Sequence, residues 1–188
     1  MTPRLVLASS SPRRAELLTL AGIAFDIDPA DVDETVRDGE AAAVYAPRIA
    51  REKALTVAAR HPSRLVLAAD TIVVQDGKVF GKPVDRADAA RMLRALSGRD
   101  HDVLTAVALA HAGTLDEELE RTGVTMSALT PAEIDWYLAS GEADGKAGAY
   151  AIQGRAARFI PRIEGSHSNV VGLPVAVVHR MLERALTR

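Results

Sequence analysis

Short apolar runs of strand length alternate with segments of helical periodicity, and this alternation restricts the fold more than any other feature. The first run, Arg4 to Ala8, is followed by three serines, and Pro12 then opens an apolar-periodic segment that reaches Gly22. Ser11 suits the N-cap position, Pro12 the first helical position and Gly22 the helix stop. The chain is therefore predicted to begin with a strand, a turn and a helix.

The alternation continues along the whole chain. Further strands are expected at residues 24–28, 64–70, 71–74, 101–110, 117–128 and 159–163, and further helices at 39–60, 85–97, 130–141 and 174–186. Pro47 should break or kink the second helix. Asp76-Gly77 resembles a hairpin turn, and the two long strands should pair antiparallel around Gly113. These signals predict an α/β fold around a mixed sheet, with no linker that would separate domains.

Composition limits the ligands that such a fold could bind. A net charge of −2 and an aromatic content of 4% weigh against a broad polyanion-binding surface and against a platform for single-stranded nucleic acid. The absence of cysteine excludes a disulfide framework, a thiolate zinc site and a cysteine nucleophile. No apolar run approaches the roughly 18 residues of a membrane span. We expect a soluble intracellular protein with no nucleic-acid or membrane partner.

The turn after the first strand could bind phosphate. Ser9, Ser10 and Ser11 precede Pro12, and Arg13 and Arg14 follow it. Backbone N–H groups at a helix N-terminus, small hydroxyls and guanidinium forks together suit phosphate oxygens. An ordinary capped helix with two solvated arginines is the alternative, and this segment alone favours that alternative.

Carboxylates follow two of the predicted strands. Asp70 and Thr71 stand at the end of an apolar strand, where α/β folds place ligand groups. Asp70 could hold a divalent metal or polarise water, or it could simply form the turn before the hairpin. Asp33 and Glu34 lie in an early loop, where a carboxylate is more often solvated than catalytic.

Lysine is rare in this chain, because 19 of the 23 basic residues are arginine. Lys53 lies on the second helix and Lys82 in a Gly-Lys-Pro loop, and an ammonium can act as a mobile point charge for phosphates. For Lys53 an ordinary exposed helix position is the alternative. Gln153 offers both a donor and an acceptor and could recognise a pyrimidine edge, although a single Gln is usually only polar surface.

These segments together resemble the Maf family of nucleoside triphosphate pyrophosphatases, linked to inhibition of septum formation, and the likeness covers nearly the whole chain. The segments that carry it are LASSSPRRAELL near the start, Asp33-Glu34, AREKA at 50–54, AADTIV at 68–73, GKP at 81–83, LSGRDHDVLTAVAL at 96–109, KAGAYAIQG at 146–154 and the GS and NVVGLP pieces of 165–174. Several motifs in the same order are far more specific than any one of them.

The resemblance implies an enzyme that hydrolyses a nucleoside triphosphate to the monophosphate and pyrophosphate. It implies dependence on a divalent cation, Mg²⁺ or Mn²⁺, a cytoplasmic location and a homodimer. It also implies a single domain over residues 1–188, with an elongated mixed sheet flanked by helices, similar to the inosine triphosphate pyrophosphatases, and two lobes with a cleft between them.

The family's residue roles can be carried onto matching positions. Asp70 would be the general base that activates water for attack at the α-phosphorus, in contact with the metal, and Glu34 would bind the metal. The triphosphate would be bound by Ser9, Arg13, Arg14, Lys53 and Lys82. Positive groups there would neutralise the charge that develops on the leaving pyrophosphate.

The base preference depends on three further matches. Arg13, Thr71 and Gln153 match the subgroup that resembles dTTP and UTP pyrophosphatases, so those nucleotides, and modified pyrimidine triphosphates, are the expected substrates. Two alternatives stay open. One is a purine-directed pyrophosphatase for inosine or xanthosine triphosphate, and the other is a nucleotide-binding regulator of cell division without catalytic activity.

Overall fold

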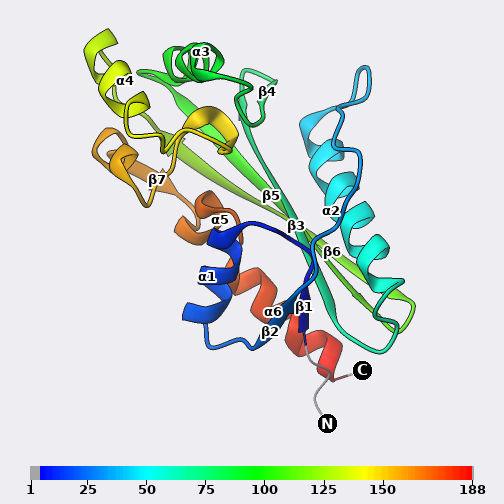
Figure 1. Cartoon of the computed structure of the whole chain (residues 1–188). Helices are drawn as coiled ribbons and strands as arrows, with labels where there is room; N and C mark the ends of the chain where they lie inside the picture. The colour runs from blue at the N-terminus through cyan, green and yellow to red at the C-terminus, as the bar shows by residue number, and fades with distance from the viewer. Residues whose placement is uncertain (1–4, 188) are drawn as a thin grey trace. The chain divides into compact units, whose positions relative to one another are not determined.

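The computed structural model describes residues 5–187 of the chain (Figure 1). Its strands are β1 (Leu5–Leu7), β2 (Phe25–Ile27), β3 (Val66–Gln75), β4 (Lys78–Phe80), β5 (Asp100–His111), β6 (Thr114–Thr125) and β7 (Arg162–Glu164). Its helices are α1 (Pro12–Leu20), α2 (Ala42–Ala58), α3 (Arg86–Leu96), α4 (Pro131–Leu138), α5 (His167–Val171) and α6 (Val175–Leu186), with 3₁₀ turns η1 (Ala147–Ala149) and η2 (Arg155–Phe159). Arg4, the first residue of the first expected strand, lies outside the described residues.

The strands form one mixed sheet, as the sequence predicts. Their order is β2-β1-β3-β5-β6-β7, and β4 pairs with β3 off this path. β1 is parallel to β2 and to β3, whereas β4 and β7 are antiparallel to their neighbours. The predicted hairpin turn at Asp76-Gly77 is confirmed, with φ values of 49° and 73°. β5 and β6 are joined through Ala112-Gly113, and so short a connection requires antiparallel strands.

By its internal contacts the chain divides into two compact units. The first contains the described residues up to Thr71 together with 105–120 and 172–187, and the second contains 72–104 and 121–171. β3, β5 and β6 each contribute to both units. The single domain and the cleft that the family resemblance implies stay predictions.

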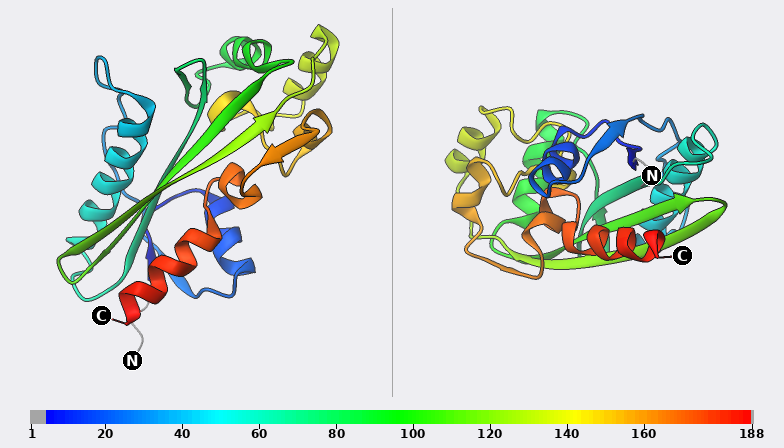
Figure 2. Two further views of the ribbon diagram at one scale, coloured as in Figure 1. Left: turned by 180° about the vertical axis from the view of Figure 1, so that it is seen from behind. Right: turned by 90° about the horizontal axis from the view of Figure 1, so that it is seen from below.

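The first unit has helices on both faces of its part of the sheet (Figures 1 and 2). Leu7, Leu67 and Leu109 point to one face and pack with Leu18 of α1 and Met181 of α6. Side chains alternate between faces along a strand, so Asp70 points to the opposite face. There α2 packs, because Lys53 of α2 contacts Asp70.

The second unit has its own hydrophobic core. Leu93 and Leu96 of α3, Tyr137 of α4 and Phe159 of η2 pack against the sheet, which contributes Val103. Residues 141–154 contain only a short 3₁₀ turn, η1, which a glycine makes possible. Gly148 has φ of 68°, and a Cβ there would lie 2.9 Å from Cγ2 of Val73.

Helix starts were the most predictable local feature. Ser11 is the N-cap of α1 with Pro12 as the first helical residue, although the Ser11 side chain makes no capping hydrogen bond. Thr130 and Glu133 form a capping box at the start of α4. Asp85 caps α3 by accepting a hydrogen bond from the Asp88 N–H.

Of the break or kink expected at Pro47, the break is wrong, because α2 continues through this residue; the kink stays a prediction. A proline this close to the helix start removes only the hydrogen bond to the Ala43 carbonyl. Ala43 is exposed, so water can satisfy that carbonyl. Beyond the proline, buried Ile49, Ala54 and Val57 hold the helix against the sheet.

Two strand predictions also need correction. Asp70 and Thr71 do not end a strand, since β3 runs unbroken from Val66 to Gln75 with both residues in its middle. β6 is shifted from the expected 117–128 to Thr114–Thr125, because the short turn at Ala112-Gly113 lets pairing start at once. The helix α5 was not predicted.

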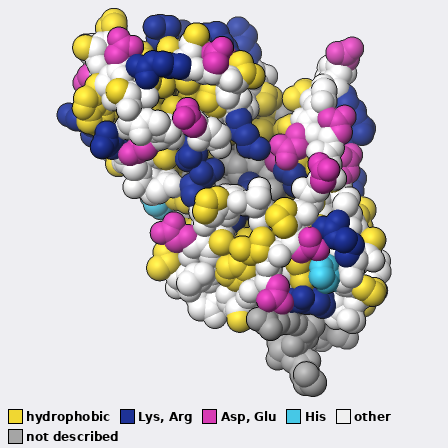
Figure 3. Space-filling model, in the orientation of Figure 1, with side chains coloured by type: hydrophobic (Ala, Val, Ile, Leu, Met, Phe, Trp, Pro, Cys, Tyr) yellow, Lys and Arg dark blue, Asp and Glu magenta, His cyan; other side chains and the backbone are white. Residues whose placement is uncertain are grey.

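No helix within residues 5–187 is both long and apolar enough to cross a membrane. On the face drawn in Figure 3, Lys and Arg side chains are interspersed with Asp and Glu side chains.

Candidate functional site

Three charged side chains predicted to act together meet in the first unit. Nζ of Lys53 lies 2.9 Å from Oδ1 of Asp70 and 2.7 Å from Oε1 of Glu34. Lys53 and Asp70 are each only 7% exposed, whereas the Glu34 side chain is 40% exposed. A buried charge is costly unless it is paired, so the contact explains how a strand interior can hold a carboxylate. We call these residues the Lys53 cluster.

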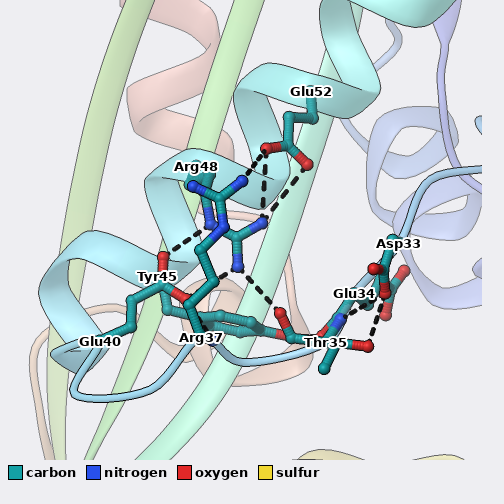
Figure 4. A network of polar contacts seen from close by, with 8 residues as sticks. All are labelled: Asp33, Glu34, Thr35, Arg37, Glu40, Tyr45, Arg48 and Glu52. Carbon is teal, nitrogen blue, oxygen red and sulfur yellow. Dashed lines mark hydrogen bonds and ion pairs between the residues drawn. The ribbon is translucent and has the colours of Figure 1, made fainter.

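Lys53 is therefore not an exposed helix residue. It belongs to the buried face of α2, whose other members include Tyr45, Ile49 and Ala50. Burial, and after it the charges of Asp70 and Glu34, raise the pKa of Tyr45 to about 12. The Tyr45 hydroxyl donates a hydrogen bond of 2.9 Å to the main-chain oxygen of Glu34 (Figure 4).

Arg14 organises a second group of side chains. Its Nε donates to the carbonyl of Gly172 at 2.8 Å, its Nη1 to Oγ of Ser9 at 3.1 Å and its Nη2 to Oγ1 of Thr71 at 3.1 Å. We call these four residues the Arg14 anchor. Ser9 is 8% exposed and its Oγ also accepts from the N–H of Ser11, which leaves its hydroxyl proton to donate elsewhere.

The anchor surrounds the Arg14 guanidinium with neutral oxygens. Burial is the largest influence on its pKa and lowers it, while the charges of Asp70 and Glu34 act in the opposite direction. Burial likewise lowers the pKa of half-buried Arg13. Both guanidinium groups thus carry charge that is incompletely solvated, and an anionic ligand would compensate it.

Asp70 and Thr71 are adjacent in sequence but serve different groups. In a strand, successive side chains point to opposite faces. Asp70 points toward α2 and the Lys53 cluster, whereas Thr71 points toward α1, where its Oγ1 contacts Arg14 and lies 3.0 Å from Oγ1 of Thr105. β3 therefore links the two groups.

Two of the predicted site residues lie in the second unit. Lys82 is in the loop between β4 and α3, and Gln153 follows η1; both are exposed. Their positions relative to Asp70 stay predictions. Asp33, the other carboxylate of the early loop, accepts hydrogen bonds from the N–H and hydroxyl of Thr35 and stabilises a local turn.

Sequence reasoning did not find Tyr45, Thr105 or Gly172. Thr105 had a signal, since it is a polar residue inside an otherwise apolar stretch of β5 and is fully buried. Gly172 lies in the NVVGLP segment, but that match gave it no role, and Tyr45 had no signal. The Tyr45 hydroxyl and the Gly172 carbonyl act on partners that only the fold brings close.

Among residues 5–187, no group of three or more His, Cys, Asp or Glu side chains is arranged to hold a metal ion. Glu34 and Asp70 nevertheless direct one oxygen each at the same ammonium. A hard divalent cation often takes one or two protein carboxylates and completes its ligands with substrate phosphates and water. This donor set fits a cation that binds together with a phosphate ligand.

The fold and the two groups of side chains together define the class of protein. It is a mixed α/β chain in which Lys53 is buried between two carboxylates and Arg14 is held beside the serine turn that precedes α1. The chain belongs to the family of Maf-like proteins, whose model matches residues 4–185.

Three similar relatives carry the name dTTP/UTP pyrophosphatase. One from Anaeromyxobacter dehalogenans (strain 2CP-1) is 55% identical over 98% of this chain and 95% of its own length. One from Myxococcus xanthus is 54% identical over 96% and 92%, and one from Koribacter versatilis is 50% identical over 96% and 94%. The Ham1 protein of Staphylococcus aureus superposes with a TM-score of 0.40 at 13% identity over 65% of this chain and 70% of its own, a likeness too slight to add to the assignment.

Proposed function

We propose that this chain hydrolyses nucleoside triphosphates to the monophosphate and pyrophosphate, with dTTP and UTP as its preferred substrates. The observation that carries this proposal is the likeness, at 50–55% identity over nearly the whole chain, to proteins named dTTP/UTP pyrophosphatase. The Lys53 cluster and the Arg14 anchor supply the chemistry that such a reaction needs.

Asp70 is the proposed general base. A carboxylate within hydrogen-bond reach of a water molecule can remove its proton as the water oxygen bonds to the α-phosphorus. The bond from that phosphorus to the bridging oxygen breaks, and pyrophosphate leaves with the electron pair. Lys53 compensates the Asp70 charge at 2.9 Å, and its ammonium is proposed to pair with the substrate phosphates as well.

Arg13, Arg14 and Ser9 are the proposed phosphate-binding groups of the first unit. Arg14 is fixed by three hydrogen bonds, so little conformational entropy is lost when a phosphate approaches its remaining N–H groups. The Ser11 side chain leaves the first N–H groups of α1 uncapped, and such groups attract phosphate oxygens. Lys82 is proposed to add a further cation from the second unit.

Mg²⁺ or Mn²⁺ is proposed as the cofactor, held by Glu34 and Asp70 together with substrate phosphates. When bound, a divalent ion neutralises charge on phosphate oxygens and on the leaving group. The protein's own contribution is to hold the two carboxylates at one point, which the two contacts to Lys53 support.

Base preference is proposed to depend on Arg13, Thr71 and Gln153. For Thr71 the contacts favour an indirect effect, because its hydroxyl is engaged with Arg14. Gln153 is the side chain with both a donor and an acceptor for a pyrimidine edge. We further propose that the enzyme acts in the cytoplasm as a homodimer, which sedimentation analysis of the purified chain would test.

A substrate panel tests the proposal directly. The purified chain with Mg²⁺ or Mn²⁺ should release pyrophosphate rather than orthophosphate, and kcat/KM should be highest for dTTP and UTP. Highest activity on inosine or xanthosine triphosphate would support the purine-directed alternative. Binding of nucleotide without turnover across the panel would support a regulator and sink the enzymatic proposal.

A further inference from the structure

Glu34 lies in a long connection, and its position there requires an explanation. Residues 28–41 between β2 and α2 contain neither helix nor strand. Holding one carboxylate of such a loop in place costs conformational entropy, and this cost must be offset by contacts that fix the loop backbone. The contacts that do so come from α2, which also carries Lys53.

Two consecutive main-chain oxygens of the loop are bound by this helix (Figure 4). Tyr45 donates to the Glu34 oxygen at 2.9 Å, and Nη2 of Arg48 donates to the Thr35 oxygen at 3.1 Å. Residues three apart on a helix lie on the same face, so Tyr45 and Arg48 form one surface. The Arg48 guanidinium also lies 5.5 Å from the centre of the Tyr45 ring.

Arg48 fixes the other end of the same loop. Its Nε lies 2.6 Å from Oε1 of Glu40 and its Nη2 lies 2.8 Å from Oε2, a two-pronged ion pair. Both side chains are nearly buried, at 11% and 6% exposure. Glu40 in turn accepts the Arg37 N–H at 3.0 Å. One arginine therefore holds residue 35 and residue 40 at once.

The helix α2 carries Lys53 and also the two side chains that bind the loop, Tyr45 and Arg48, which we call the clamp. Lys53 follows Tyr45 by eight residues, just over two turns, and belongs to the same buried face. The distance from Glu34 to Lys53 is thus set within a single rigid element plus two hydrogen bonds.

We infer that Tyr45 and Arg48 are positioning residues that hold the Glu34 carboxylate against Lys53 and Asp70. This inference rests on the proposed pyrophosphatase function. Neither side chain needs to touch the substrate, because each acts on the main chain beside Glu34. Their loss should misplace Glu34 and lower kcat more than it raises KM for the nucleotide.

The experiment compares Tyr45→Phe and Arg48→Lys with the wild type. Tyr45→Phe removes one hydrogen bond and should lower kcat about three- to tenfold, the range that corresponds to about 0.7 to 1.4 kcal/mol. Arg48→Lys cannot reproduce the fork that binds Thr35 and Glu40 together, so it should lower kcat at least as much. Arg51→Lys is the matched control, since Arg51 makes a two-pronged ion pair with Glu117 on the exposed side of α2. Its kcat should stay within twofold of the wild type.

A double-mutant cycle separates positioning from a general loss of structure. If Tyr45 acts through Glu34, Tyr45→Phe should cost little further in a Glu34→Gln background, in kcat or in Mn²⁺ affinity measured by calorimetry. Equal losses in both backgrounds would overturn the inference.

Hydrogen exchange of residues 33–40 provides a readout that does not depend on activity. Exchange should accelerate in Tyr45→Phe and Arg48→Lys and stay unchanged in Arg51→Lys. Unchanged exchange and unchanged kcat in the first two variants would refute the clamp. A wild type that turns over no nucleotide would instead defeat the proposed function, and the exchange data would still decide whether the clamp holds the loop.

Discussion

Asp70 shows how a carboxylate can be buried in the interior of a strand when a second side chain compensates its charge. It sits in the middle of β3 at 7% exposure, and its compensating charge comes from Lys53, 17 positions earlier in the chain. The sequence predicted both residues as functional but not their pairing. Lysine rarity and an acidic residue in an apolar run are local signals, whereas a contact between a helix and a strand arises only when the two elements pack.

The first prediction concerns this carboxylate. Asp70→Asn keeps the shape of the side chain and removes its capacity as a base, so kcat should fall about 100-fold or more while nucleotide binding persists. The variant should fold, because Lys53 keeps its second partner, Glu34, at 2.7 Å. Turnover assays and calorimetric binding of dTTP with Ca²⁺ in place of Mg²⁺ would measure the two effects.

Asp28→Asn is the control for that experiment. Asp28 is paired with Arg60 and His61 outside both groups described above, and those hydrogen bonds lower its pKa to about 2. Its replacement should leave kcat unchanged. A near-normal rate in Asp70→Asn would remove Asp70 from the role of general base.

At the scale of elements, β3 brings two chemically different groups together by simple alternation. Asp70 serves the α2 face and Thr71 the α1 face, so one strand connects the Lys53 cluster to the Arg14 anchor. The sequence predicted that a strand ends at Asp70, because an apolar strand usually ends where a charged residue follows it. Lys53 compensates the charge of Asp70, so the strand can continue through it, and no local sequence pattern indicates this pairing.

The loop residue Gly172 should matter to the anchor through its backbone. Its φ of 126° is unfavourable for any residue with a Cβ, and its carbonyl accepts the Arg14 Nε hydrogen bond at 2.8 Å. Gly172→Ala should therefore destabilise the fold by about 1–3 kcal/mol and shift Arg14. The expected kinetic result is a several-fold rise in KM for the nucleotide.

Gly22→Ala separates these two effects. Gly22 has φ of 70°, a Cβ there would meet nothing within 4 Å, and it ends α1 away from Arg14. This variant should lose about 1 kcal/mol of stability in urea unfolding but keep the wild-type KM. A rise in KM of equal size in both variants would show that KM reports stability rather than the position of Arg14.

At the scale of the whole molecule, the division into units explains what local patterns could not predict. The chain passes between the units at residues 71–72, 104–105, 120–121 and 171–172, and three of these points lie at or within β3, β5 and β6. A boundary inside a strand has no proline, glycine or polar linker to mark it. Most strands and helices were predictable from local patterns. Two lobes were expected only from the family resemblance, and no local pattern marked the points where the chain passes between them.

Stability of the whole chain should depend on pH through His101. This residue is 4% exposed in the core of the second unit, its Nε2 lies 2.8 Å from the Tyr150 hydroxyl, and burial lowers its pKa to about 4. The unfolded chain would protonate His101 near pH 6.5 and therefore binds more protons than the folded chain between pH 6.5 and 4. Stability should fall as the pH falls through that window, by about 2 kcal/mol from this group between pH 7 and pH 5.

Urea unfolding at pH 7 and pH 5 would measure that difference, with His101→Phe as the comparison. The variant keeps an aromatic ring against Tyr150 but leaves the Tyr150 hydroxyl without its partner, so it should be less stable at pH 7. It should also lose the part of the pH dependence that His101 contributes. Ion-paired carboxylates such as Glu40, whose pKa is lowered to about 2 chiefly by its hydrogen bonds with Arg48, lose their contribution only below about pH 4.5, outside this comparison. An equal loss of stability between pH 7 and pH 5 in both proteins would show that His101 is not the group responsible.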